Sequence, residues 1–333
     1  MNGRILTILT GGTICSSVNA DGKRYSDARN VRIIEAFERS GSPYAGSVSF
    51  ETVYASDILS ENMTTTVWNH LLRCFADVHW ADVDGVIVLH GTDTLAYTSA
   101  MLAVALRGLP HPVVMVSAQL PLSEPESNGH ANFRAAVALI ESDVKPNVYA
   151  VYRNADGNMY VHTGAALRQC QPYSNDFHSD GETVIEDIDR VSYKGVRTPA
   201  DKMILRAMRP LRSDVMLLEP YVGMDYGRIR IEGLRAVVHT AYHSGTLCVS
   251  EKAGSASVIT LLERCRKYGV SVFVTPVSGE DYGYVTTGEL LAHGAVPLTG
   301  MTAETVYAKA LVGSALGYWG AELESFVRDG SSM

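Results

Sequence analysis

A run of apolar residues near the start of the chain stops at two glycines, and this break limits what the chain can fold into. The segment Arg4–Ser16 reads RILTILTGGTICS, and its part Ile5–Leu9 is typical of a buried strand in a parallel sheet. Gly11 and Gly12 allow positive φ and leave room for a second molecule beside Thr13. Ligands bind beyond the carboxyl ends of strands in open α/β sheets. Thr13 is therefore either a nucleophile at such an end or an incidental residue of a tight strand exit.

Small hydroxyl-bearing residues also follow a second apolar run, Val86–Leu89. This run continues into HGTDT at His90–Thr94 and then into a long helical pattern. A threonine or an aspartate at a helix start often serves only as a cap. Alternatively, the exposed N–H groups and hydroxyls there polarise a bound carbonyl or carboxylate. The repetition of small hydroxyl-bearing residues at two strand exits favours this second interpretation. His90 has no second histidine three or four residues away, so we expect a hydrogen-bonding role rather than metal ligation.

Strand and helix patterns alternate along the first half of the chain, which predicts right-handed βαβ units and an α/β fold. We expect a doubly wound, flavodoxin-like or Rossmann-like parallel sheet. Because 333 residues exceed the usual size of one domain, a second and smaller α/β domain is predicted. A charged stretch with a Thr-Pro step marks the linker, so the predicted boundaries are 1–190 for the first domain, 191–212 for the linker and 213–333 for the second domain.

Two polar stretches carry neither a helical nor a strand period and are predicted to be irregular. Ser17–Asn30 follows Thr13 closely and is expected to be an exposed, mobile loop, which makes it a candidate lid. Tyr25, its single aromatic residue, is either an ordinary surface tyrosine or a contributor to the neighbouring site. The second stretch runs from Ala155 to about Asp180.

Charge and cysteine content argue against several classes of partner and site. A net charge of −8 without long basic runs disfavours nucleic acid or an anionic membrane as partner and favours a small soluble ligand. The five cysteines are scattered and lack CxxC spacing, which disfavours a disulfide framework or a thiolate zinc site and fits a reducing cytoplasm. Apolar runs fall short of the ~20 residues that span a bilayer, and the N-terminus lacks a signal-peptide pattern, so we expect a cytoplasmic protein.

The two strand exits together resemble those of a known family. TGGTI at Thr10–Ile14 and HGTDTLAYTSAML at His90–Leu102 are similar, in this order, to the two signature segments of the bacterial asparaginase/glutaminase family, the threonine amidohydrolases. The resemblance continues through VMVSAQLPLSE and AYHSGT into YVTTGELLAHGAVPLTGMTAETVYAK, so it covers nearly the whole chain. In the absence of a leading extension, the chain resembles the cytoplasmic branch more than the secreted one.

The resemblance implies a double-displacement hydrolysis of an amide, with no metal and no organic cofactor. Thr13 would attack the side-chain carboxamide to give an acyl-enzyme, helped by Tyr25 from the closing loop. Water activated near Thr92 would then release the acid, and the Thr92–Asp93 pair would take part in proton transfer. Cys15, two residues beyond Thr13, is the rival nucleophile.

The same resemblance implies a pocket for the head group of a free amino acid. Ser60 and Glu61 match the pair that holds the α-carboxylate and the α-ammonium group, and Asp93 matches an aspartate that also holds the ammonium. Gly91 and Thr92 would complete the substrate contacts. A free amino acid carries both charges, so hydroxyl or amide donors beside carboxylates suit it. The implied partner is a small amino-acid amide.

One departure from the family pattern bears on catalysis. Family members carry a lysine that supports the Thr-Asp pair, but here its position falls on Gly164 or Ala165, and the stretch Pro146–Tyr193 contains no lysine. His162 is a candidate substitute because an ordinary histidine pKa of about 6.5 suits proton transfer. Arg168 could supply only positive charge, because arginine does not readily deprotonate. Each of these two residues could equally be structural.

Three functions stay open on the sequence alone. The chain is an amidohydrolase acting on L-asparagine, L-glutamine or a relative, an enzyme of the same fold acting on a derivatised or cyclic amide, or a non-catalytic protein that binds an amino acid. If the lysine is decisive, we expect weak activity on L-asparagine or none. The family resemblance also implies a homodimer or homotetramer whose cleft is completed by the neighbour's second domain, and the turn Tyr242–Thr246, which lacks a partner motif in its own domain, favours the same assembly.

Overall fold

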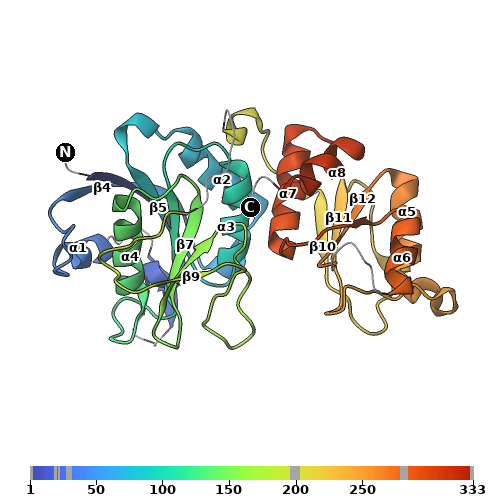
Figure 1. Ribbon diagram of the computed structural model, residues 1–333, viewed down its shortest axis with the longest axis horizontal. Helices are drawn as coiled ribbons and strands as arrows, with labels where there is room; N and C mark the ends of the chain where they lie inside the picture. The colour runs from blue at the N-terminus through green and yellow to red at the C-terminus, as the bar shows by residue number, and fades with distance from the viewer. Residues whose placement is uncertain are drawn as a thin grey trace. The chain divides into compact units, whose positions relative to one another are not determined.

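The computed structural model describes residues 3–18, 21, 23–27, 32–195, 203–277 and 284–330. The chain forms two compact units, Met1–Ala207 and Met208–Gly330 (Figure 1). Each unit has its own sheet and its own apolar core, so the predicted two-domain α/β fold is confirmed. Among the described helices, none has the length and apolar character needed to cross a bilayer.

The first unit is built on a seven-stranded sheet with the order β4-β1-β5-β6-β7-β8-β9. Strands β4, β1, β5, β6 and β7 are parallel, whereas β8 and β9 run antiparallel at one edge. The bounds are β1 Gly3–Gly11, β4 Val48–Ile58, β5 Gly85–Leu89, β6 Val113–Val116, β7 Val148–Arg153, β8 Met159–Thr163 and β9 Thr183–Ile185. All residues of β5 and β6 are buried, as expected for parallel strands covered on both faces.

The parallel strands follow the flavodoxin-like order, because β1 lies between β4, the next strand of this sheet along the chain, and β5. The strand order therefore reverses at β1. In such sheets, ligands bind in the crevice beyond the carboxyl ends of the strands at this reversal. The turns that follow β1 and β5 and carry Thr13 and Thr92 lie at this position.

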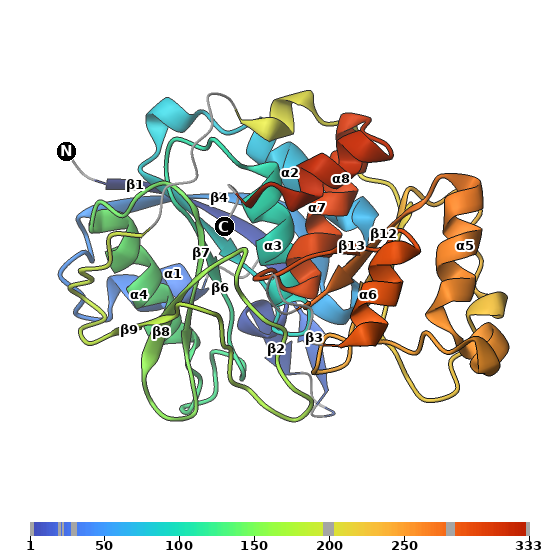
Figure 2. The same ribbon diagram turned by 45° about the vertical axis from the view of Figure 1, so that its right-hand side comes forward.

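Two layers of helices cover this sheet. α1 (Arg32–Glu38) and α4 (Gly129–Glu141) pack together on one face, and α2 (Thr65–Ala76) and α3 (Leu95–Ala105) lie on the other (Figures 1 and 2). Thr64 caps α2, since its side chain accepts the N–H of Val67 at 3.4 Å. Helix α3 is buried on almost all sides from Leu95 onward, so packing fixes the position of the helix that follows Thr92 and Asp93.

The stretch from Ala155 to about Asp180 is less irregular than predicted, because β8 lies within it and pairs with β7. The two strands are joined by an Asp-Gly turn, in which Asp156 Oδ1 accepts the N–H of Asn158 at 2.9 Å and Gly157 has a φ of 86°. An Asp-Gly step between apolar runs is a hairpin signal that the sequence interpretation missed. The sheet is consequently mixed rather than wholly parallel.

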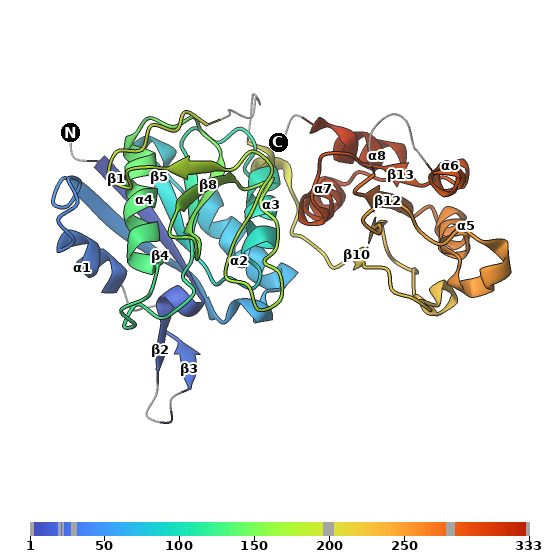
Figure 3. The same ribbon diagram turned by 60° about the horizontal axis from the view of Figure 1, so that its bottom comes forward.

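The expected irregular loop after Thr13 also contains regular structure. β2 (Ser16–Val18) and β3 (Arg24–Ser26) form a two-stranded antiparallel hairpin that projects away from the sheet (Figure 3). The hairpin is anchored at its base, where the N–H of Asp27 donates to Cys15 O at 2.9 Å. Residues 19, 20, 22 and 28–30 of the predicted lid lie outside the described residues.

The second unit contains a four-stranded parallel sheet with the order β10-β11-β12-β13. Its helix α7 packs against β10, β11 and β12, and α5 packs against β12. The strands are β10 Val215–Leu218, β11 Ala236–Thr240, β12 Ser271–Thr275 and β13 Val296–Pro297, and the helices are α5 Val258–Tyr268, α6 Val285–Ala292, α7 Ala303–Leu316 and α8 Ala321–Arg328. This smaller unit is α/β, as predicted.

Candidate active site

The turns after β1 and β5 meet main chain to main chain. Gly12 has a φ of 81°, and a Cβ atom on it would collide with Gly91 and would lie 2.9 Å from His90 C. A Cβ atom on Gly91 would lie 2.7 Å from Ser60 Cβ and 3.1 Å from Gly12 Cα. Glycine is required at both positions because the two segments of the chain approach each other too closely for a side chain. The structure thus brings three predicted segments into one place.

Thr13 begins a short 3₁₀ helix, η1 (Thr13–Cys15), immediately after this contact. The turn is fixed by two main-chain hydrogen bonds, from Gly12 N to Ile58 O at 2.8 Å and from Cys15 N to Gly12 O at 3.0 Å. The Thr13 carbonyl accepts the Ser16 hydroxyl at 2.8 Å, and Thr13 itself is half-buried. Thr13 is therefore carried on a turn that main-chain hydrogen bonds hold in place, directly after the contact of Gly12 with Gly91.

Cys15 is a poor competitor for the nucleophile's role. Its side chain is buried, and burial raises the pKa of the thiol to about 12. A buried neutral thiol is inert, because the thiolate is the nucleophilic form.

Ser60 links the loop after β4 to the loop after β5. It lies in the 3₁₀ helix η2 (Ser60–Asn62) after β4, and its buried Oγ accepts the N–H of Asp93 at 3.2 Å and lies 3.4 Å from Asp93 Oδ2. The Thr94 hydroxyl donates to Ser60 O at 2.9 Å. Glu61, the next residue, is exposed. Ser60 and Asp93 therefore form one unit, with Glu61 at its solvent edge.

Thr92 and Asp93 precede the first turn of α3, whose N-cap residue is Thr94. Thr92 is half-buried and Asp93 is exposed. The positive end of the helix dipole lies here, together with main-chain N–H groups that have no partner within the helix. Such a position suits the carboxylate of a ligand or the developing negative charge on a carbonyl oxygen.

His90 has the hydrogen-bonding role that was predicted. Its ring is fully buried and its Nδ1 lies 2.7 Å from Gly91 O, so it braces the turn. Burial lowers the pKa of His90 to about 4, which keeps the ring neutral near pH 7. Over the described ranges, His, Cys, Asp and Glu residues form no group of three or more that could hold a metal ion.

Tyr25 lies beside a different hollow. It is 48% exposed and lines a cavity of about 560 Å³ together with Ile14, Cys15 and Ser16 and with residues of α1 and α4. Thr13 is not one of the described residues that line this cavity. The structure places Tyr25 near the Thr13 turn but not in the Ser60–Asp93 unit.

The two positions considered for the family lysine are closely packed. A Cβ atom on Gly164 would lie 2.9 Å from Val148 Cγ1 and 3.0 Å from Ser99 O, and Ala165 is buried. Steric crowding, rather than a positive φ, is what restricts Gly164 to glycine. A lysine at Gly164 would displace the strand and helix beside it.

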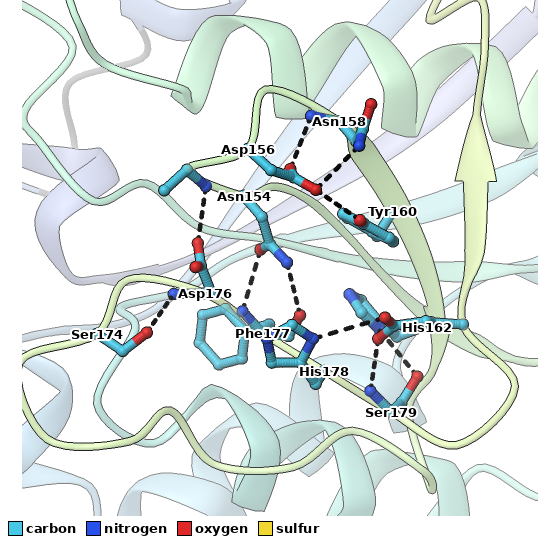
Figure 4. Close-up of polar contacts among 12 residues, drawn as sticks. Asn154, Asp156, Asn158, Tyr160, His162, Ser174, Asp176, Phe177, His178 and Ser179 are labelled. Carbon is cyan, nitrogen blue, oxygen red and sulfur yellow. Dashed lines mark hydrogen bonds and ion pairs between the residues drawn. The ribbon is translucent and has the colours of Figure 1, made fainter.

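Both candidate substitutes for the lysine have other partners. His162 is buried, with Nδ1 2.8 Å from Ser179 Oγ and 3.7 Å from Glu182 Oε2 (Figure 4). Burial lowers the pKa of His162 to about 4, against the smaller opposing effect of Glu182. Arg168 is exposed and pairs with Asp180 at 2.8 Å. Neither geometry directs the side chain to the Thr92–Asp93 pair.

The side chain of this segment that does reach Asp93 is Gln169, which sequence reasoning missed. Its Nε2 donates to Asp93 O at 2.5 Å. A single polar residue in a stretch predicted to be irregular carries no sequence signal that could have selected it.

The chain is similar in sequence to known proteins of one family. Residues 4–199 match the family model described as "Asparaginase, N-terminal". The chain is 30% identical over 328 residues to a glutamyl-tRNA(Gln) amidotransferase subunit from Aeropyrum pernix, an alignment that covers 92% of this chain and 73% of that protein. It is 32% identical over 232 residues to the protein of the same name from Haloquadratum walsbyi, covering 66% of this chain and only 50% of that protein.

Two solved structures share the whole fold. The thermostable L-asparaginase from Thermococcus kodakarensis superposes with a TM-score of 0.78 at 21% identity, covering 99% of this chain and 98% of that chain. L-asparaginase I from Vibrio cholerae superposes with a TM-score of 0.75 at 19% identity, with the same two coverages of 99% and 98%. At these identities the likeness concerns the fold alone, and it confirms the two-domain α/β architecture.

Proposed function

Since this chain belongs to the asparaginase family, we propose that it hydrolyses the side-chain amide of a small amino acid or a related small amide through an ester formed on Thr13. The observation that carries the proposal is the contact of Gly12 with Gly91, which places the Thr13 turn beside the turn that bears Thr92 and Asp93. Two residues with hydroxyls and one with a carboxylate then follow neighbouring strands at the reversal of the strand order, where such sheets bind ligands.

In the first step, the Thr13 hydroxyl oxygen attacks the carboxamide carbon, so that a C–O bond forms, the C–N bond breaks and ammonia leaves with the hydroxyl proton. In the second step, water attacks the ester carbon, the acid is released and Thr13 regains its proton. Thr92 and Asp93 are assigned to the second step, because they lie at the helix N-terminus, where a developing negative charge is favoured. Tyr25 is assigned to the first step from its place in β3, next to the nucleophile turn.

The substrate's amino-acid head group is assigned to Ser60, Glu61, Gly91, Thr92 and Asp93. Ser60 and Asp93 are already linked to one another, so a carboxylate acceptor and a hydroxyl donor are held side by side. This pairing suits a zwitterion, whose ammonium and carboxylate need opposite partners within a few ångströms.

A second function needs a direct test, because several relatives are named as a subunit of glutamyl-tRNA(Gln) amidotransferase and align over 92% of this chain or more. An amidotransferase passes the nitrogen of a donor amide to an acceptor, so the donor step at Thr13 would be the same. The acceptor named there is a glutamyl-tRNA, which runs against the expectation of no nucleic acid partner drawn from the net charge of −8. The charge of one chain does not decide the partner of an assembly to which it belongs.

The test measures ammonia release from L-asparagine and from L-glutamine, each with and without glutamyl-tRNA(Gln). Turnover that needs no tRNA supports the amidohydrolase, and turnover that appears only with tRNA supports the amidotransferase. If the position of the family lysine falls on Gly164 or Ala165, as the resemblance implies, weak turnover of L-asparagine or none is expected. Binding of an amino acid without turnover would support the non-catalytic alternative, and neither binding nor turnover would point to a derivatised or cyclic amide.

The nucleophile is tested with a matched pair of variants. Thr13→Ala should abolish covalent labelling by an electrophilic amide analogue, read by mass spectrometry. Thr52→Ala, at an exposed position of β4, removes the same atoms away from the crevice and should leave labelling unchanged. Undiminished labelling of the Thr13→Ala variant would show that another residue is the nucleophile.

A further inference from the structure

Each polar part of Asp93 has a side-chain partner. Its N–H donates to Ser60 Oγ at 3.2 Å, its carboxylate lies 3.4 Å from the same oxygen, and its carbonyl accepts from Gln169 Nε2 at 2.5 Å. Ser60 approaches from the loop after β4, whereas Gln169 approaches from the segment between β8 and β9. Asp93 is therefore clamped between two elements that are far apart in the sequence.

Gln169 is carried on a well-anchored stretch of chain. Leu167 is fully buried and bridges to Ser179, and the N–H of Arg168 donates to His178 O at 2.9 Å. On the other side, the Cys170 thiol lies 3.2 Å from Asp176 O. With both flanks fixed, the carboxamide of Gln169 is presented to Asp93 without a large loss of conformational entropy.

The segment Asp176–Ser179, which lies opposite this stretch, is anchored in turn to the β7–β8 hairpin (Figure 4). Asn154 makes two hydrogen bonds to the main chain of Phe177, at 2.9 and 3.0 Å, and Asp176 Oδ1 accepts the N–H of Ala155 at 2.7 Å. His162 holds Ser179 through the 2.8 Å contact of Nδ1 with Oγ. The support for Gln169 thus extends back to the sheet.

We propose that Gln169 is a positioning residue that fixes the Asp93 main chain, so that the Asp93 carboxylate is aimed at the α-ammonium group of the substrate. The inference rests on the proposed function, because it assigns that ammonium group to Asp93. Gln169 donates to the carbonyl and not to the carboxylate, so the carboxylate has Ser60 Oγ, 3.4 Å from Oδ2, as its side-chain neighbour and can still accept from a ligand. A neutral amide is suited to this task, since a carboxylate at the same place would repel both the carbonyl and the carboxylate of Asp93.

The test compares three variants of the whole chain. Gln169→Ala removes the donor, and Gln169→Glu keeps the size but replaces the donor with an acceptor. Gln171→Ala, two residues away at an exposed position, is the matched control. Calorimetric titration with L-aspartate and L-glutamate, the acids formed from the two amides, measures the dissociation constant, and ammonia release measures kcat and KM.

Gln169→Ala should weaken acid binding by about threefold to tenfold, the effect of losing one hydrogen bond, and should raise KM more than it lowers kcat. Gln169→Glu should weaken binding further at pH 7, and this deficit should shrink as the pH falls and the introduced carboxylate becomes a donor. Gln171→Ala should change neither quantity. Equal binding in all variants, or a deficit of Gln169→Glu that does not depend on pH, would overturn the proposal.

A readout independent of turnover separates this proposal from the proposed function. Amide hydrogen exchange in the peptide around Asp93 should become faster in Gln169→Ala and stay unchanged in Gln171→Ala. If the wild-type protein binds neither acid and releases no ammonia, the proposed function fails, and unchanged exchange in Gln169→Ala would then reject the positioning role as well. Faster exchange at Asp93 together with unaltered acid binding would show that the clamp has no bearing on the ligand and would also reject the proposal.

Discussion

The buried Oγ of Ser60 accepts the main-chain N–H of Asp93 at 3.2 Å, which joins the loop after β4 to the start of α3. The hydroxyl satisfies a donor that the helix cannot satisfy itself, and it lies 3.4 Å from the Asp93 carboxylate. This one side chain therefore connects the loops that follow β4 and β5, two strands of the parallel part of the sheet.

Replacing this serine should loosen the link. Ser60→Ala leaves the Asp93 N–H without its acceptor and should lower the free energy of unfolding by about 1–3 kcal/mol. Urea denaturation of the variant measures the loss, and Ser325→Ala, at an exposed position of α8, should lie within about 0.5 kcal/mol of wild type. An equal effect of the two substitutions would mean that the Ser60–Asp93 bond contributes nothing.

The contact between Gly12 and Gly91 should tolerate no added carbon. Gly91→Ala places a methyl group 2.7 Å from Ser60 Cβ and 3.1 Å from Gly12 Cα, so it should destabilise the protein by about 1–3 kcal/mol and abolish ammonia release. Gly288→Ala is the matched control, because its Cβ atom would meet nothing within 4 Å, and it should leave both stability and activity intact. Thermal unfolding and the ammonia assay check both variants, and an active, stable Gly91→Ala protein would contradict the close contact of Gly91 with Gly12 and Ser60.

Restoring a lysine at Gly164 should fail for a steric reason. The first carbon of the new side chain would lie 2.9 Å from Val148 Cγ1 and 3.0 Å from Ser99 O, between β7 and α3. We expect Gly164→Lys to lower stability by about 1–3 kcal/mol without a gain in turnover. Gly288→Lys, at an open and exposed site, controls for the added charge. A stable Gly164→Lys protein with faster turnover would support the placement of the family lysine at this position.

Stability should fall in mild acid through His162. Its pKa is lowered from 6.5 to about 4 by burial, with Glu182 and His178 as the charged neighbours, so the unfolded chain binds a proton before the folded chain does. The free energy of unfolding should therefore decrease as the pH falls from about 6.5 to about 4, by on the order of 3 kcal/mol from this residue. Buried His90 acts in the same direction.

The check is urea denaturation at pH 7 and pH 5. His162→Gln should reduce the difference between the two pH values, because the variant has no proton to take up at this site. His70→Gln, at an exposed position, should keep the full difference. A pH dependence that His162→Gln leaves unaltered would contradict a neutral, buried imidazole.

The assembly state stays a prediction. We expect light scattering to give a mass two or four times the chain mass of 36.1 kDa, since closed symmetric assemblies are the commonest and the turn Tyr242–Thr246 is expected to complete a neighbour's cleft. Tyr242 is 39% exposed, which leaves it accessible for such a contact. A mass of one chain for protein that still binds its ligand would reject the prediction.

Local features of the sequence were sufficient for the α/β class and for the two strand exits. Apolar runs such as Ile5–Leu9 and Val86–Leu89 report strands directly, because a parallel strand is buried on both faces and must be apolar throughout. Gly11 and Gly12 were recognisable as a turn for an equally local reason. The Asp156–Gly157 turn was just as local, and it was overlooked.

The tertiary structure alone decided which side chains meet. Ser60 contacts Asp93 because the β4–β1–β5 pairing brings their loops together, and Gln169 reaches Asp93 because the antiparallel β8 turns its segment back over α3. The sequence offered His162 and Arg168 as partners of the Thr92–Asp93 pair. The same packing buries His162 and pairs Arg168 with Asp180, so neither side chain faces that pair. Strand order and burial are set by contacts between distant segments, which the local periodicity of a sequence does not encode.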